Sequence, residues 1–214
     1  IKALLRGKVA YLFNKYCSSR AINILMFCHD QMNYNVTDMP FVIDKWVKEY
    51  VGKDMEERKN TVSHSDGVPP LFVIATKFNM DMTLDQNNMN SEMNSVDAVN
   101  KRWDGRFQEV LYRDCLQAHS VEWFRNWVHE GETFKNTYLL RDFKYSTCSG
   151  DGSSLYEGYV EDDENPKEIK LHLPTEFYDR LRNTFIENSI VGKFFEDPSK
   201  SWDLATTLNN DGAL

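Results

Sequence analysis

Three short apolar runs, set well apart along the chain, constrain its fold more than any other feature. They span residues 22–28, 71–75 and 137–140, and each is bounded by polar residues. A short run that is apolar on both sides is typical of a strand buried on both faces of a sheet. We therefore expect near-complete burial of the following residues: Ile24, Met26, Val73, Ala75 and Leu139.

Helical spacing of apolar residues fills the chain around these runs. The spacing predicts helices near residues 4–16, 40–51, 99–111, 121–129, 175–186 and 202–204. Residues 53–67 are charged and polar, and predict a surface connection. Helices that alternate with strands indicate a parallel α/β fold. The sequence thus predicts a small parallel sheet of at least three strands with helices on both faces.

The whole chain, residues 1–214, reads as one domain with surface insertions near 80–97 and 143–170. It begins with Ile1 rather than Met, which indicates a fragment of a larger protein. Its formal net charge of −8 argues against nucleic acid as the main partner. No apolar run approaches the length of about 20 residues that a membrane span needs. Four cysteines without CxxC spacing indicate reduced thiols and a cytoplasmic protein.

The turn after the second apolar run carries the strongest candidate site. In an open parallel sheet, ligands bind at the carboxyl ends of the strands. Thr76-Lys77-Phe78-Asn79 resembles the Thr/Asn-Lys-x-Asp turn with which GTP-binding domains read guanine. Here the fourth residue is Asn79, and Asp81 follows two positions later. An amide offers one donor group and one acceptor, so it cannot accept two hydrogen bonds from guanine as a carboxylate does. The alternative is an ordinary strand exit whose lysine points to solvent.

The phosphate-binding half of a nucleotide site has no counterpart in the sequence. GxxxxGK[ST] is absent, and Arg6-Gly7-Lys8-Val9 lacks both the upstream glycine and the hydroxyl of that motif. A DxxG motif is also missing ahead of the first apolar run. The chain alone is therefore expected to be catalytically inactive and to hold no cofactor of its own.

Two other groups of residues suit either a chemical or a plain structural role. His29 and Asp30 follow each other at the end of the first predicted strand. Together they could ligate a metal ion or act as an acid–base couple. The alternative is that both are partly exposed loop residues without a chemical role. Cys28 precedes His29, but adjacent strand residues point to opposite faces, so they do not form a nucleophile–base pair. The acidic run at 161–164 could bind a basic partner or a divalent ion. The alternative is a solvated loop with no ligand.

Several phrases along the chain resemble the SrfC-type putative virulence factor family of bacteria. They are RGKVAYLF at 6–13, PPLFV at 69–73 running into TKF at 76–78, EW at 122–123, FKNT at 134–137, LR at 140–141, DP at 197–198 and WD at 202–203. The resemblance covers most of the chain in order, except the stretches 80–97 and 144–170. Asn79 departs from the aspartate of that family.

The resemblance implies the second half of a P-loop GTPase-like domain. The phosphate loop and the metal-side aspartate would then lie upstream of Ile1, and the parent protein would bind GTP and Mg²⁺. On this interpretation the base-binding residues are Thr76, Lys77, Asn79, Asp81, Arg141 and Asp142. The alternative is a non-catalytic protein-interaction module on a degenerate GTPase scaffold, with loops at 53–68, 80–97 and 143–170 contacting a partner.

Overall fold

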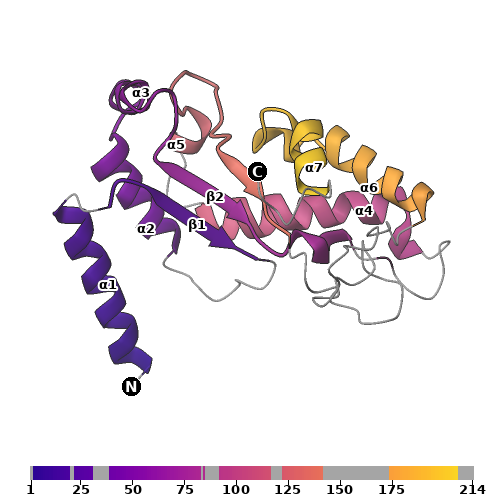
Figure 1. Cartoon of the computed structure of the whole chain (residues 1–214), viewed down its shortest axis with the longest axis horizontal. Coiled ribbons are helices and arrows are strands. Elements are labelled where there is room, and N and C mark those ends of the chain that lie inside the picture. The colour runs from indigo at the N-terminus through magenta and orange to yellow at the C-terminus, as the bar shows by residue number, and fades with distance from the viewer. Residues whose placement is uncertain are drawn as a thin grey trace, which may run out of the picture.

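The computed structural model describes residues 2–19, 22–30, 39–82, 84, 92–116, 122–141 and 174–206. These residues form seven α-helices and one three-stranded sheet (Figure 1). The first half contains α1 (Lys2–Ser18), β1 (Leu25–His29), α2 (Met39–Trp46), the π-helical turn η1 (Val47–Val51), α3 (Met55–His64) and β2 (Leu71–Ala75). The second half contains the short 3₁₀ helices η2 (Phe78–Met82) and η3 (Glu92–Asn94), α4 (Val96–Trp103), the π helix η4 (Asp104–Leu116), α5 (Glu122–Arg125), β3 (Thr137–Leu139), α6 (Thr175–Glu187), the 3₁₀ helix η5 (Val191–Lys193) and α7 (Pro198–Thr206).

The sheet is parallel throughout, in the order β1-β2-β3, which confirms the predicted parallel α/β fold. Phe27 pairs with Val73 and Val73 with Thr137, so these residues lie in one row across the sheet. His29, Ala75 and Leu139 form the next row, at the carboxyl end of all three strands. The proposed ligand edge is therefore built from three neighbouring strand ends.

One face of the sheet packs against the core and the other is largely exposed in the described part of the chain. Phe27, Val73 and Ala75 are buried, but Met26 is 62% exposed and Tyr138 49%. Ile24, just ahead of β1, is 58% exposed. The predicted near-complete burial of Ile24 and Met26 is wrong, and Leu139, predicted to be buried as well, is only half-buried. Among the described residues, cover by helices holds for one face only. Right-handed crossovers that run in one direction place their helices on the same face, which explains the asymmetry.

Aromatic side chains fill the core between the sheet and helices α4, α6 and α7. Phe78, Trp103, Phe185 and Trp202 are each fully buried and meet in edge-to-face and offset-stacked pairs. Such pairs add about 0.5–1.5 kcal/mol each beyond the burial of their area. Figure 1 shows α6 and α7 beside α4 at one end of the molecule. The core therefore lies directly behind the turn that follows β2.

Residues 53–67 contain a helix where the sequence predicts only a surface connection. Asp54 caps α3 by accepting a hydrogen bond from the backbone N–H of Glu57 at 2.9 Å. The Glu57 carboxylate in turn accepts from the backbone N–H of Lys53 at 3.1 Å. These caps begin a helix that has only a weak apolar pattern. The acidic run at 161–164 lies outside the described residues.

Candidate functional site at the carboxyl edge of the sheet

Backbone hydrogen bonds hold the Thr76–Asn79 turn between its two neighbouring strands. The N–H and the side-chain hydroxyl of Thr76 both donate to the carbonyl of His29, at 2.8 and 2.9 Å. The Phe78 N–H donates to the carbonyl of Leu140, two residues after Tyr138, at 3.0 Å. The turn thus joins the exits of β1 and β3, and its position is fixed by the sheet.

Lys77 adopts a left-handed backbone conformation, with φ at 55°. For a residue other than glycine this conformation costs roughly 1–2 kcal/mol. The Lys77 ammonium lies 2.6 Å from the Asp30 carboxylate, across the edge from β2 to the end of β1. The lysine side chain is 55% exposed, so its stem lies along the surface of this edge. A conformation of this kind persists only where the surrounding structure fixes it.

Phe78 turns inward and anchors the turn in the aromatic core. Its ring stacks on Trp103 with centroids 6.0 Å apart and meets Trp202 edge-on at 5.8 Å. Because Phe78 is fully buried, the turn projects the residues on either side of it toward the surface. Asn79 and Met80, the next two residues of η2, are half-buried.

A buried ion pair lies immediately beneath the turn. Arg106 Nε lies 3.5 Å from Asp81 Oδ2, and both side chains are almost fully buried. Arg106 Nη2 also donates to the carbonyl of Thr76 at 2.8 Å and to that of His29 at 3.4 Å. The guanidinium therefore links η4 to the ends of β1 and β2. The Asp81 carboxylate faces a cation of the protein itself.

His29 is a buried, neutral histidine at the end of β1. Only 1% of the residue is exposed, and its ring stacks on Phe27 with centroids 5.9 Å apart. Burial, and then the charge of Arg106, lower the pKa of His29 to about 3. Neither ring nitrogen has a hydrogen-bond partner among the described residues. A histidine with this pKa does not act as an acid–base group near pH 7.

The two strand-end candidates from the sequence thus have different surroundings. Asp30 pairs with Lys77, whereas the His29 ring faces the core. Cys28 lies on the face opposite His29, as strand alternation predicts, but this face is exposed although the sequence predicted a strand buried on both faces. Within the described ranges, no three His, Cys, Asp or Glu side chains gather as a metal ion would require.

The structure brings most of the predicted base-binding residues to one edge. Thr76, Lys77, Asn79 and Asp81 lie on the turn and η2, and Arg141 follows β3 as a buried residue. Asp142 lies outside the described residues. Sequence reasoning missed Arg106. Its position three residues after Trp103 and four before Val110 places a charged residue on an apolar helix stripe, which is the signal that could have found it.

Comparison with known proteins places the chain in a family. A family model described as "putative bacterial virulence factor" matches residues 1–214. The chain belongs to this family. That description names no ligand, reaction or partner. No curated protein and no solved structure matches the chain. Among the described residues, no helix is long and apolar enough to cross a membrane.

Proposed function

We propose that the carboxyl edge of the sheet forms the base-side wall of a purine nucleotide site in this virulence factor. The observation that carries the proposal is the Thr76–Asn79 turn, which lies at the end of the central strand and is tied to the strands on both sides. Ligands of open parallel sheets bind at this end of the strands.

The individual side chains support the same role. The Lys77 ammonium reaches Asp30 at the end of β1, so its stem crosses this edge of the sheet, where an aliphatic chain can lie against a purine ring. Its ion pair with Asp30 holds the ammonium in place. Strain at a residue other than glycine, when it lies at a strand end, favours a functional role over an ordinary strand exit.

The fourth residue of the turn determines which purine such a site prefers. Asn79 presents an amide that can exchange its donor and acceptor by rotation, so we expect poor discrimination among purines. Asp81 follows on η2, beside Arg106. In this proposal the site holds the base, and the phosphates and Mg²⁺ are bound by a loop that the 214-residue sequence does not contain.

The substitution Asn79→Asp tests this assignment. A carboxylate would supply acceptors for both N–H groups of guanine, each such bond contributing about 1.5–3 kcal/mol. The preference for GTP over XTP should rise at least about tenfold, which needs only about 1.4 kcal/mol. The measurement is competition binding of the two nucleotides to the full-length protein, before and after the substitution. An unchanged ratio would show that Asn79 does not face the base.

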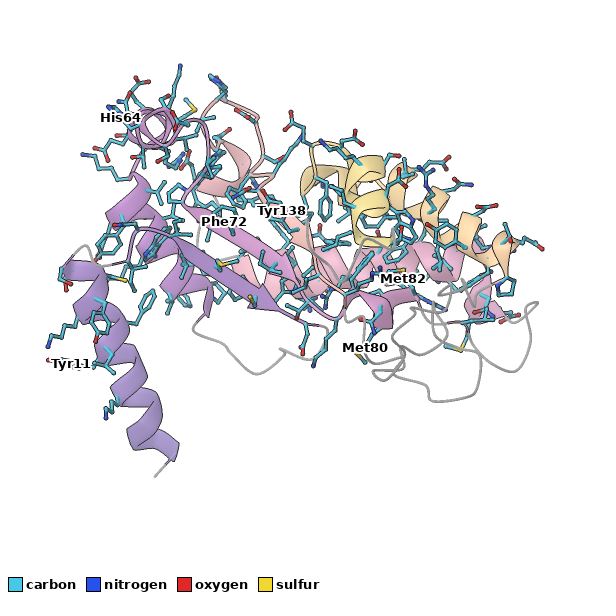
Figure 2. The ribbon with its side chains drawn as sticks, in the orientation of Figure 1. Tyr11, His64, Phe72, Met80, Met82 and Tyr138 are labelled. Carbon is cyan, nitrogen blue, oxygen red and sulfur yellow. The ribbon has the colours of Figure 1, made fainter. Side chains whose placement is uncertain are left out.

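A second candidate function is a protein-interaction module, and the open face of the sheet favours it. Phe72 and Tyr138 stack across β2 and β3 with ring centroids 5.8 Å apart (Figure 2). Met26 lies on the same face and is largely exposed. Parallel sheets ordinarily have both faces covered, so exposed apolar and aromatic residues here are typical of a contact surface. Failure to bind any nucleotide in the competition experiment would favour this function.

A further inference from the structure

The face of the sheet that the helices leave uncovered is apolar. Strand alternation places the following described side chains on it: Ile24, Met26, Cys28, Phe72, Tyr138 and Leu140. Four of these, Ile24, Met26, Tyr138 and Leu140, are 49–62% exposed. Within the three strands, no residue on this face is charged. The ion pair of Asp30 and Lys77 lies beyond the strand ends, at the border of the face.

The polar groups on this face are bonded to the protein itself. The Tyr138 hydroxyl donates to Asn136 Oδ1 at 2.8 Å, and Asn136 Nδ2 donates to the carbonyl of Leu71 at 2.6 Å. Phe72 stacks on the Tyr138 ring beside them (Figure 2). Removal of the face from water therefore leaves these donors bonded, and the usual cost of burying polar groups is avoided.

The size of the exposed face fits the centre of a protein–protein interface. Its exposed side chains present on the order of 500 Å², which is at the upper end of the single patches that monomers expose. A stable interface buries about 800 Å² on each partner, with an apolar centre and a polar rim. The open face supplies such a centre, and the ion pair at its border supplies part of a rim.

We propose that two copies of this chain associate face to face through the open side of the sheet. Sheets pack in this way about 10 Å apart, and a two-fold axis pairs the same patch of both copies. An axis along β2 brings β1 of one copy opposite β3 of the other. The flexible side chain of Met26 then lies on the side of the partner's aromatic pair, to which a thioether adapts well.

This proposal names the partner of the open face, and so it rests on the interaction function proposed above. It does not depend on the nucleotide edge, which lies at the ends of the strands. The charge of the chain favours a second copy as that partner. The net charge is −8, so two copies repel one another over much of their surface, but not through a face without charged residues. A basic partner would instead be drawn to the acidic surfaces of the chain.

The test is sedimentation velocity of the 214-residue chain between about 1 and 300 µM. We expect a reversible dimer with a dissociation constant between about 1 and 100 µM. Met26→Lys should raise this constant at least about tenfold, because the dimer would bury two added charges. The matched control is Met93→Lys on η3, outside the sheet. Met93 is 63% exposed, against 62% for Met26, and its substitution should leave the dimer unchanged.

A second measurement needs no substitution. Cys28 is exposed in the single chain, so its alkylation by iodoacetamide, followed at this residue by mass spectrometry, reports whether the face is covered. We expect alkylation at about 300 µM protein to be at least about threefold slower than at about 1 µM, because only the free monomer reacts.

The proposal is overturned if the folded chain is monomeric over the whole range, or if Met26→Lys and Met93→Lys dimerise equally well. A monomer whose Cys28 reacts freely at every concentration would leave the face available to a different protein, so the interaction function would stand without self-association. If Cys28 is protected equally at every concentration, the chain itself covers the face, and both self-association and the interaction function fail.

Discussion

Replacement of Arg58 by alanine is expected to lower the free energy of unfolding by about 3–5 kcal/mol. The Arg58 side chain is completely buried and joins α3 to the segment around α5. Its Nε donates to the carbonyl of Trp127 at 2.8 Å, and its Nη2 to the carbonyl of Asn126 at 2.7 Å. Nη2 also lies 3.2 Å from the carboxylate of Glu122. Alanine would leave these carbonyls without their donor and open a cavity among aromatic side chains.

Urea unfolding of the variant measures this effect, with Lys59→Ala as the control. Lys59 is the exposed neighbour of Arg58 on α3, and its removal should change stability by no more than about 0.5 kcal/mol. Arg58→Lys should recover only part of the loss, because one ammonium cannot reproduce the planar fork of donors. A loss below about 1 kcal/mol for Arg58→Ala would contradict this account of the contact between α3 and α5.

The backbone beside Arg58 has little room for change. A Cβ atom at Gly52 would lie 2.4 Å from the backbone nitrogen of Arg58 and 2.7 Å from the carbonyl carbon of Glu57. Both neighbours are backbone atoms, which cannot move aside as a flexible side chain would. Glycine is therefore required at position 52, between η1 and α3.

The stability of the protein should fall by about 2 kcal/mol between pH 7.5 and pH 5 because of His29 alone. The pKa of His29 is about 3 in the folded state, against an ordinary value near 6.5 when the chain unfolds. Between these values the unfolded state binds the extra proton. The contribution of His29 is therefore complete above pH 6.5 and is lost progressively as the pH falls toward 3.

The variant His29→Phe isolates this contribution, since it keeps an aromatic ring against Phe27 and removes the titrating group. As the pH falls below 6.5, we expect the free energy of unfolding of the original chain to decrease relative to that of the variant. His129→Gln, at an exposed position, should leave the pH dependence unchanged. If His29→Phe also leaves it unchanged, the ring of His29 is not buried in its neutral form.

The strands and the candidate site were largely predictable from sequence because both depend on local patterns. Apolar runs located all three strands, and the rule for strand ends located the Thr76–Asn79 turn. Burial was harder to predict. Met26 and Val73 belong to equally apolar runs, yet only Val73 faces helices, since that depends on which face the crossovers cover.

Helix α3 and the role of Arg106 were not predicted, for two different reasons. Helix α3 has a weak apolar pattern, so its beginning is visible only in the Asp54 and Glu57 caps. Arg106 acts through an ion pair with Asp81 and through the carbonyl of Thr76, which lies 30 residues earlier in the chain. No sequence pattern connects those positions, and only the packing of η4 beneath the turn brings them together.

The most direct test of the proposed nucleotide edge is a titration of the ¹⁵N-labelled chain with guanosine monophosphate, followed by amide chemical shifts. We predict weak binding, with a dissociation constant of about 1 mM or weaker, because the phosphate loop is absent from the sequence. The shifts should be confined to Thr76–Asn79 and to the residues that follow β1 and β3, including Asp30 and Arg141. Shifts spread over other surfaces, or no shift even at about 20 mM nucleotide, would contradict a base-binding role for this edge.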